Sequence, residues 1–244
     1  MDWTSQLFNY CERGNDATFW AEPLNAISNA TFLIAAVLAA LRLSQSQPRD
    51  GGATPEWLLV MLAGLVGTGS FLFHTFATIW AVTADVGAIF AFTYSYFGYA
   101  LRRYFGFGWF ATLAGLAVLL GAIVLSANIP CDPGLLPITA AAGKSCLNGS
   151  LEYLPVLGAL GLVGTVLVAR AHPAGKFLLA AGAVFAVSLT LRTLDIEICA
   201  LTGWFGKVRG THFMWHCLNA VTIYLLLAAA VSTGSGTARL RTAA

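Results

Sequence analysis

The chain has 244 residues, of which 58% are hydrophobic and only 10% are charged, and its formal net charge is +2. A soluble domain carries about 25% charged residues, so this composition excludes an ordinary soluble globular protein. The sequence has no basic patches interleaved with aromatic residues, and it indicates no nucleic-acid partner. Long charge-free apolar runs instead predict an all-α integral membrane protein with several spans.

Seven segments of the chain have the length and apolar character of a transmembrane helix, which needs about 20 apolar residues. They are predicted at 22–42, 56–76, 80–101, 107–127, 151–170, 176–195 and 211–232. A tight turn at 77–80 separates the second from the third, because the apolar run 57–84 is too long for one crossing. The sequence thus predicts a single seven-transmembrane-helix bundle, residues 1–232, followed by a disordered cytoplasmic tail, residues 233–244.

Lys and Arg residues near the predicted helix ends indicate the orientation in the membrane. Eight of them fall on the side that holds the C-terminus, and four fall on the other side. The eight are Arg42, Arg49, Arg102, Arg103, Arg170, Lys176, Arg239 and Arg241, and the four are Arg13, Lys144, Lys207 and Arg209. This asymmetry predicts a cytoplasmic C-terminus and an N-terminus on the outer side, which is periplasmic or lumenal.

Four of the five cysteines are predicted on the outer side, where disulfides persist. They are Cys11, Cys131, Cys146 and Cys199. Four thiols allow three connectivities. We favour Cys131–Cys146 within the loop 127–150, and Cys11–Cys199 between the N-terminal segment and the loop before the last helix. The alternative is four free thiols.

Hydroxyl, acid and imidazole groups recur at the outer ends of the predicted helices. In "GTGSFLFHTF" (67–76), Ser70 and His74 are four residues apart, and Asp85 follows in the first turns of the next helix. In "GTHFMWHCLN" (210–219), His212 and His216 are also four apart. Residues i and i+4 share one face of a helix, and ionisable groups at membrane depth face a bundle interior or a cavity. We therefore expect these side chains to converge.

Three imidazoles from two helices are typical of a catalytic zinc that keeps its fourth position for water. Zinc lowers the pKa of that water to about 7, so Asp85 is a candidate base for it and Ser70 a candidate oxyanion donor. The HxxxH pair alone also fits helix packing, a proton relay or an axial haem site. Haem takes two axial ligands, and a third histidine with an aspartate at the same level argues against it.

Four stretches resemble the ordered signatures of the alkaline ceramidases, which belong to a seven-helix membrane hydrolase superfamily that includes the adiponectin receptors. They are "YCERGNDATFWAEPLNAISN", "GTGSFLFHTF" followed by Asp85, "LRTLDIEIC" and "GTHFMWHCLN". The resemblance covers nearly the whole chain. It implies hydrolysis of the ceramide amide bond to a sphingoid base and a fatty acid.

The same resemblance implies a role for each candidate residue. His74, His212 and His216 would bind zinc, Asp85 would take the proton of the zinc-activated water, and Ser70 would help to stabilise the oxyanion. The family pattern also supports a disulfide between Cys11 and Cys199.

The chain departs from the family at its calcium site. The family uses a D-W-C-E-x-N stretch and the glutamate that opens the first helix, whereas this chain has "NYCERG" at 9–14. Glu12 and Glu22 match the pattern, and Asn15 follows close by, so the resemblance implies a calcium site at these three residues. Calcium prefers several carboxylates among six to eight oxygen ligands, so the missing acid weakens or abolishes binding. The alternative is a structural ion pair that joins Glu12 and Arg13 to the outer loops.

The leading hypothesis is a zinc-dependent lipid amidase whose partner is a membrane lipid, ceramide or a related N-acyl lipid, entering between helices. One alternative keeps the zinc site and acts on another N-acyl or ester lipid. Another is a non-enzymatic receptor or transport protein with a structural metal site, which usually has four protein ligands. Arg192, Asp195 and Glu197, at the outer end of the sixth predicted helix, are interpreted as a structural network.

Overall fold

The computed structural model describes residues 2–46, 53–129, 146–204 and 206–234, and most of these residues are helical. The α-helices are the short α1 (Pro23–Ser28) and the long α2 (Ala30–Ser44), α3 (Thr54–Phe76), α4 (Ile79–Arg103), α5 (Trp109–Ala127), α6 (Leu154–Ala169), α7 (Ala174–Leu194) and α8 (His212–Gly234). The short 3₁₀ helices are η1 (Cys146–Gly149), η2 (Leu151–Tyr153) and η3 (Cys199–Leu201). The strands β1 (Gly203–Trp204) and β2 (Lys207–Val208) form an antiparallel hairpin.

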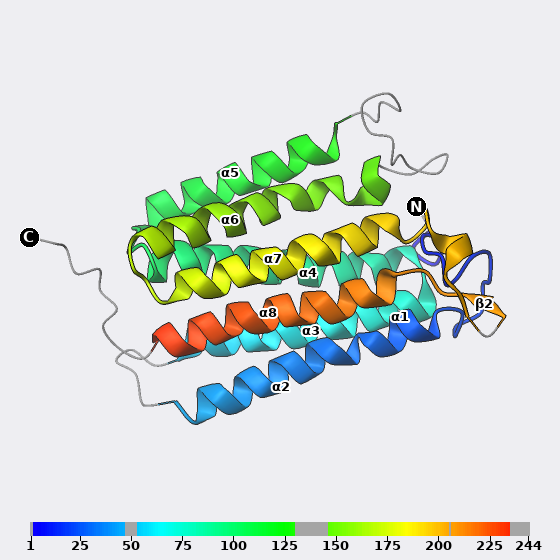
Figure 1. Cartoon of the computed structure of the whole chain (residues 1–244), viewed down its shortest axis with the longest axis horizontal. Helices are drawn as coiled ribbons and strands as arrows, with labels where there is room; N and C mark the ends of the chain where they lie inside the picture. Colours follow the sequence, from blue (N-terminus) through cyan, green and yellow to red (C-terminus); the bar gives the residue numbers. More distant parts are fainter. Residues whose placement is uncertain (1, 47–52, 130–145, 205, 235–244) are drawn as a thin grey trace, which may run out of the picture.

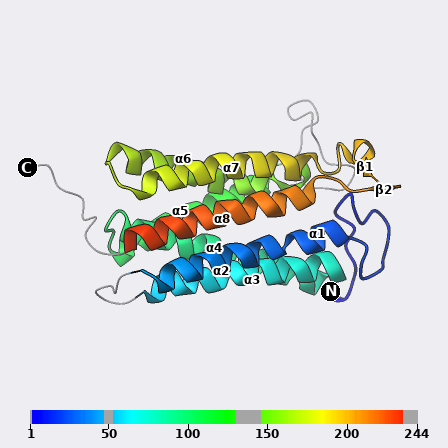
Figure 2. The same ribbon diagram turned by 60° about the horizontal axis from the view of Figure 1, so that its bottom comes forward.

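The helices run side by side along one direction (Figure 1). From α2 to α8, each long helix packs on the next one in the sequence, and α8 returns to pack on α2, so that the helices form a closed ring. Figure 2 shows the same arrangement turned by 60°, with α2 and α3 beside α8. The beginning of α8, the end of α3 and the N-terminal segment 2–22 lie at one end of the bundle, hereafter the N-terminal end.

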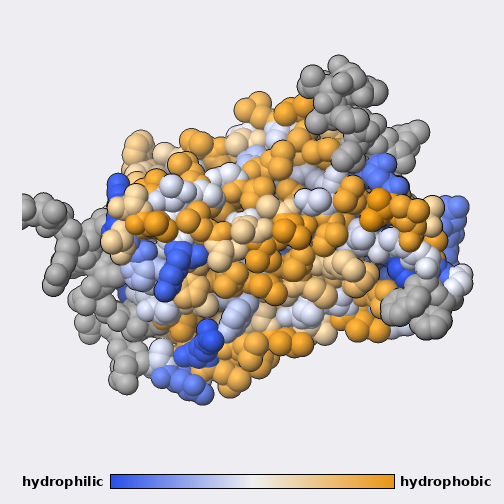
Figure 3. All heavy atoms as spheres, viewed as in Figure 1, coloured by the Kyte–Doolittle hydropathy of each residue, from blue (hydrophilic) through white to orange (hydrophobic). Residues whose placement is uncertain are grey.

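Six helices are long and apolar enough to cross a membrane, which is compatible with the predicted multi-pass membrane protein. Hydrophobic residues cover the middle of the face shown in Figure 3, and the most hydrophilic residues gather near its two ends. On α5, Phe110 is 88% exposed and Val118 is 73% exposed, as lipid-facing side chains would be. The remaining predicted span, 80–101, corresponds to α4. This helix has 25 residues but is not among the six. Its Asp85 and its three tyrosines make it less apolar.

The boundaries agree with the predicted segments to within a few residues, with one correction. The helix predicted at 22–42 is broken at Asn29 into α1 and α2. The side chains of Ser28 and Asn29 both donate hydrogen bonds to the Asn25 carbonyl, and such local bonds compete with the helical backbone pattern. A tight turn follows α3 as predicted, but it is shorter than 77–80: α3 ends at Phe76, Ala77 adopts a left-handed conformation, and α4 begins at Ile79. The predicted tail mostly lies outside the described residues, and α8 continues to Gly234.

The N-terminal segment is held against the bundle by a disulfide and by a buried carboxylate. Cys11 and Cys199 are bonded, with 5.6 Å between their Cα atoms, which confirms that predicted pair. The Asp195 carboxylate accepts hydrogen bonds from the backbone N–H groups of Cys11, Thr211 and His212, so it joins this segment to the start of α8. Burial raises the pKa of Asp195, although these three bonds act to lower it. The predicted partner of Cys146, Cys131, lies outside the described residues.

We expect the Cys11→Ser/Cys199→Ser double variant to unfold at a lower temperature than the wild type. The disulfide closes a loop of 188 residues, and removing a native disulfide typically costs about 2–5 kcal/mol. Thermal unfolding in detergent, with and without reductant, measures the difference. Cys217→Ser is the matched control, because Cys217 is a free thiol. An unchanged Tm in the double variant would contradict the prediction.

Candidate metal centre

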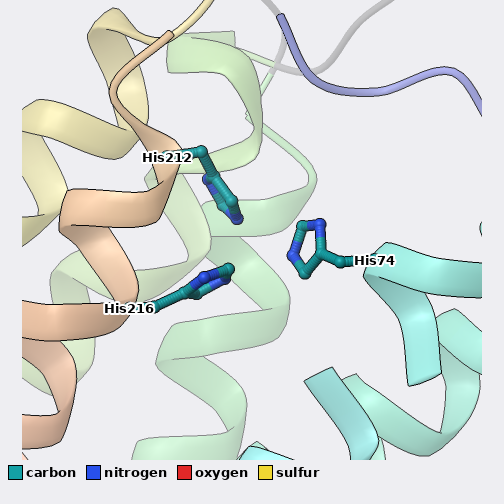
Figure 4. Close-up of side chains that lie close together, drawn as sticks. All are labelled: His74, His212 and His216. Carbon is teal, nitrogen blue, oxygen red and sulfur yellow. The ribbon is translucent and has the colours of Figure 1, made fainter. Parts of the chain in front are cut away.

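Three histidines meet inside the N-terminal end of the bundle. His74 lies in the last turn of α3, and His212 and His216 lie in the first two turns of α8. One ring nitrogen from each lies within 4.8 Å of the other two, and all three side chains are buried. Figure 4 shows the three rings pointing toward one another. Across the described ranges, no other group of His, Cys, Asp and Glu forms such a cluster.

The hydrogen bonds around the rings fit a bound metal ion. His74 Nδ1 lies 2.6 Å from Glu22 Oε2, and His216 Nδ1 lies 2.8 Å from Ser28 Oγ. Ser28 donates its own proton to the Asn25 carbonyl, so its oxygen accepts from the His216 ring. In both rings Nε2 is then left for a metal, as is usual for ligating histidines. His212 Nδ1 is buried without a hydrogen-bond partner among the described residues, a cost that metal binding by the ring would explain.

The three imidazole donors favour a transition metal or zinc. Imidazole suits zinc, copper, iron and nickel. The described residues contribute no fourth ligand to the cluster, and three histidines alone are typical of an open site rather than a closed structural one. The structure therefore defines a candidate three-histidine metal centre.

Glu22 connects this centre to the N-terminal segment. One of its oxygens lies 2.5 Å from Arg13 Nε, and the other lies near the His74 ring and accepts from Asn25 Nδ2. Burial acts to raise the pKa of Glu22, but His74, Asn25 and Arg13 together hold it below its ordinary value. Glu22 is thus an ionised carboxylate that orients the His74 ring.

We expect Glu22→Gln to weaken metal binding by about 10–100-fold, the usual effect of losing a carboxylate behind a histidine ligand. The amide is nearly the same size but cannot hold the imidazole N–H as strongly. Competition with a chromogenic chelator measures the affinity. Glu152→Gln is the control, because Glu152 lies in η2 and is not a member of the three-histidine group. Equal affinity in wild type and Glu22→Gln would contradict the prediction.

Asp85 and Ser70 lie together and line the same cavity as His212 and His216. A Cβ on Gly69 would lie 2.8 Å from the Ala84 carbonyl oxygen. Only glycine therefore allows α3 to approach α4 this closely, and the approach brings Ser70 beside Asp85. The Asp85 carboxylate interacts with His74 and with the Ser70 hydroxyl. Its Oδ1 is buried without a hydrogen-bond partner in the described part of the chain, so it is free to accept a proton.

A cavity of about 510 Å³ lies inside the helix ring and reaches this group. Ser70, Asp85, His212 and His216 line one part of it. Its remaining walls are mainly apolar and include Phe97, Leu119, Ile123, Leu178 and Leu226. Such a cavity accommodates a hydrocarbon chain while polar groups act at one end.

Sequence reasoning missed several neighbours of the histidines. Tyr10 stacks on His212 with 3.8 Å between ring centroids, and burial raises its pKa, so its phenol stays neutral. Ser28, Arg13 and Trp215 were not predicted to support the site. No local spacing marks them, although Tyr10, Arg13 and Ser28 all lie within one of the stretches that resemble the ceramidases.

The residues of the predicted calcium site are mostly engaged with other groups. Glu12 accepts hydrogen bonds from the backbone N–H groups of Leu24 and Asn25, and it pairs with Arg209 at 3.1 Å. Asn15 is exposed, and Glu22 is paired with Arg13. The alternative of structural ion pairs thus finds support, with Arg209 as the partner of Glu12. Calcium binding itself stays a prediction.

Comparisons of the chain with models of protein families and with curated proteins give no match. The resemblance to the alkaline ceramidases therefore rests on the motifs alone.

Proposed function

We propose that the chain is a zinc-dependent membrane amidase that hydrolyses the amide bond of ceramide to a sphingoid base and a fatty acid. The observation that carries the proposal is the position of a buried Asp85 carboxylate oxygen, which has no hydrogen-bond partner among the described residues, beside three converging imidazoles on an apolar cavity. An acid, a hydroxyl and a three-histidine site are the groups that amide hydrolysis needs.

His74, His212 and His216 would hold the zinc ion. When bound there, zinc supplies a Lewis acid that polarises a carbonyl group and makes water more acidic. Asp85 accepts a proton from the water whose oxygen forms the new bond to the amide carbon. The Ser70 hydroxyl donates a hydrogen bond to the carbonyl oxygen as negative charge develops on it. When the C–N bond breaks, Asp85 returns the proton to the leaving amine.

The membrane arrangement supports a lipid substrate. In this proposal α4 also crosses the membrane, in addition to the six helices that are apolar enough to do so. The N-terminal end of the bundle, which holds the candidate metal centre, faces the outer side, as the distribution of Lys and Arg predicts. The apolar part of the cavity, between α4, α5, α6 and α8, holds one hydrocarbon chain. The three-histidine donor set disfavours the receptor alternative, because structural zinc sites are usually closed by four protein ligands.

Mass spectrometry of products from a panel of ceramides, other N-acyl lipids and ester lipids tests the proposal. We expect purified, zinc-loaded protein in ¹⁸O-labelled water to release sphingoid base and fatty acid that carries one labelled oxygen. Cleavage of another N-acyl or ester lipid instead would keep the metal chemistry and refute the ceramide assignment. No turnover of any lipid by folded, metal-loaded protein would refute the enzyme and favour the receptor.

A further inference from the structure

Arg192, in the last turns of α7, is a cation on the wall of the cavity. Its Nη1 donates to the Asn148 carbonyl at 2.9 Å and to Ser150 Oγ at 2.8 Å. Its guanidinium carbon lies 5.0 Å from the ring centroid of Tyr153 and 5.6 Å from that of Trp215. Among the described residues, its Nε and Nη2 make no hydrogen bond. Glu152 and Asp85 interact with it electrostatically, but neither forms a salt bridge with it.

A guanidinium group with unsatisfied N–H donors on the cavity wall costs free energy unless a ligand accepts hydrogen bonds from it. A charged side chain inside a membrane protein is retained where it binds a partner or lines a functional cavity. Two neutral oxygens and two aromatic faces compensate part of the desolvation, but three N–H groups of the guanidinium still lack acceptors. Because Arg192 lines the cavity, oxygen atoms of a bound lipid can supply those acceptors.

Arg192 lies close to the metal centre. Trp215 contacts it and also stacks on His212, with 6.4 Å between the ring centroids. Glu152 and Asp195 line the same cavity, so a phosphate at this place would meet carboxylates. A hydroxyl group can accept from Arg192 and donate to Glu152.

We propose that Arg192 binds the hydroxyl-bearing headgroup of the lipid substrate while the amide lies at the histidines. The inference rests on the proposed function and adds a subsite that selects the long-chain base.

The test compares wild type and Arg192→Gln on ceramide and on analogues that lack the 1-hydroxyl or both hydroxyl groups. We expect Arg192→Gln to lower kcat/KM for ceramide on the order of 10–100-fold, the effect of a hydrogen bond to a charged group. For the deoxy analogues, the two proteins should differ little. Arg170→Gln is the control, because Arg170 also lies over an aromatic ring, that of Phe105, and it is not on the cavity wall.

An equal loss for all substrates would show that Arg192 is only structural and overturn the proposal. A wild-type preference for the phosphorylated lipid would overturn the choice of a hydroxyl headgroup. Equilibrium binding of the same lipids to Arg192→Gln and wild type, in the inactive His212→Ala background, separates this proposal from the proposed function. If Arg192→Gln in this background no longer binds ceramide more tightly than the deoxy analogues, the subsite is supported even if no lipid is cleaved.

A second, independent inference concerns Arg13, which is buried at the N-terminal end. Its guanidinium group donates to five oxygens: Glu22 Oε1 and the carbonyl oxygens of Asp16, Thr18, His74 and Thr75. A guanidinium group has five N–H donors, so every donor can be satisfied. The same group that holds Glu22 against His74 also joins the N-terminal segment to the end of α3.

We infer that the Arg13 guanidinium takes the place of a calcium ion at the N-terminal end of the bundle. It positions His74 through Glu22, and no calcium ion is needed. The oxygens of Glu22 are already taken by Arg13, Asn25 and His74, and Glu12 is paired with Arg209. A calcium ion would have to displace both guanidinium groups. Arg13 is thus a positioning residue that acts on the metal ligand through Glu22.

Metal affinity and calcium response together test the role of Arg13. We expect Arg13→Gln to weaken metal binding at least threefold and to change the visible spectrum of the cobalt-substituted protein, with partial recovery in Arg13→Lys. Calcium added to dialysed wild type should leave Tm unchanged. Arg209→Gln is the control, since it removes the partner of Glu12 and leaves Glu22 untouched. A saturable rise in Tm with calcium, or an unchanged metal affinity in Arg13→Gln, would overturn the inference.

Discussion

His212→Ala is expected to remove both the bound metal and the hydrolytic activity. His212 is one of the three candidate ligands, and the metal-binding group found among the described residues contains no fourth member. The loss should exceed the roughly 10–100-fold typical of a residue behind a ligand. Metal content by elemental analysis and product formation by mass spectrometry give two separate measurements.

His172→Ala is the matched control for this variant. His172 is the fourth histidine, lies between α6 and α7, and accepts a hydrogen bond from the Ala174 backbone N–H. We expect this variant to keep its metal, even if it is less stable. If His212→Ala retained a full equivalent of metal, the three-histidine centre would be refuted. If it lost the metal but kept its activity, the metal would be structural.

Asp85→Asn is expected to keep the metal and the fold but to lose activity on the order of 10²–10⁴-fold, the range for removing a general base. Asparagine has nearly the same shape, and Asp85 Oδ1 has no partner within the described residues that the amide would disrupt. The measurements are kcat on the best substrate, metal content and Tm.

The control for Asp85→Asn is Asp2→Asn, because Asp2 is an exposed acid whose side chain bonds to its chain neighbours Thr4 and Ser5. That variant should behave as the wild type. Full activity in Asp85→Asn would refute the proposed base. Loss of metal from Asp85→Asn would show that Asp85 is itself a ligand, and a closed four-ligand site would favour the receptor.

The close approach of α3 and α4 explains why part of the site could be predicted from spacing. Ser70 and His74, like His212 and His216, share a helix face, which follows from the helical repeat alone. Asp85 follows across a tight turn, so its helix must return beside α3. Such local relations need no knowledge of how distant helices pack.

The disulfide could be predicted only in part from the sequence. The sequence predicted four cysteines on one side of the membrane, but four thiols leave three pairings open. Only packing brings Cys11 and Cys199 to a Cα distance of 5.6 Å across 188 residues of chain.

The sequence by itself determined a helical bundle compatible with a multi-pass membrane protein, its approximate helix bounds and the histidine spacings of the candidate site, because apolar run length and the helical repeat are local properties. The tertiary structure decided that Glu22 orients His74, that Ser28 orients His216, that Arg13 is the cation behind Glu22, and that Arg192 faces the cavity. Each of these depends on which helices are neighbours in the ring. That choice is made by side-chain packing between segments far apart in the chain, which no local spacing encodes.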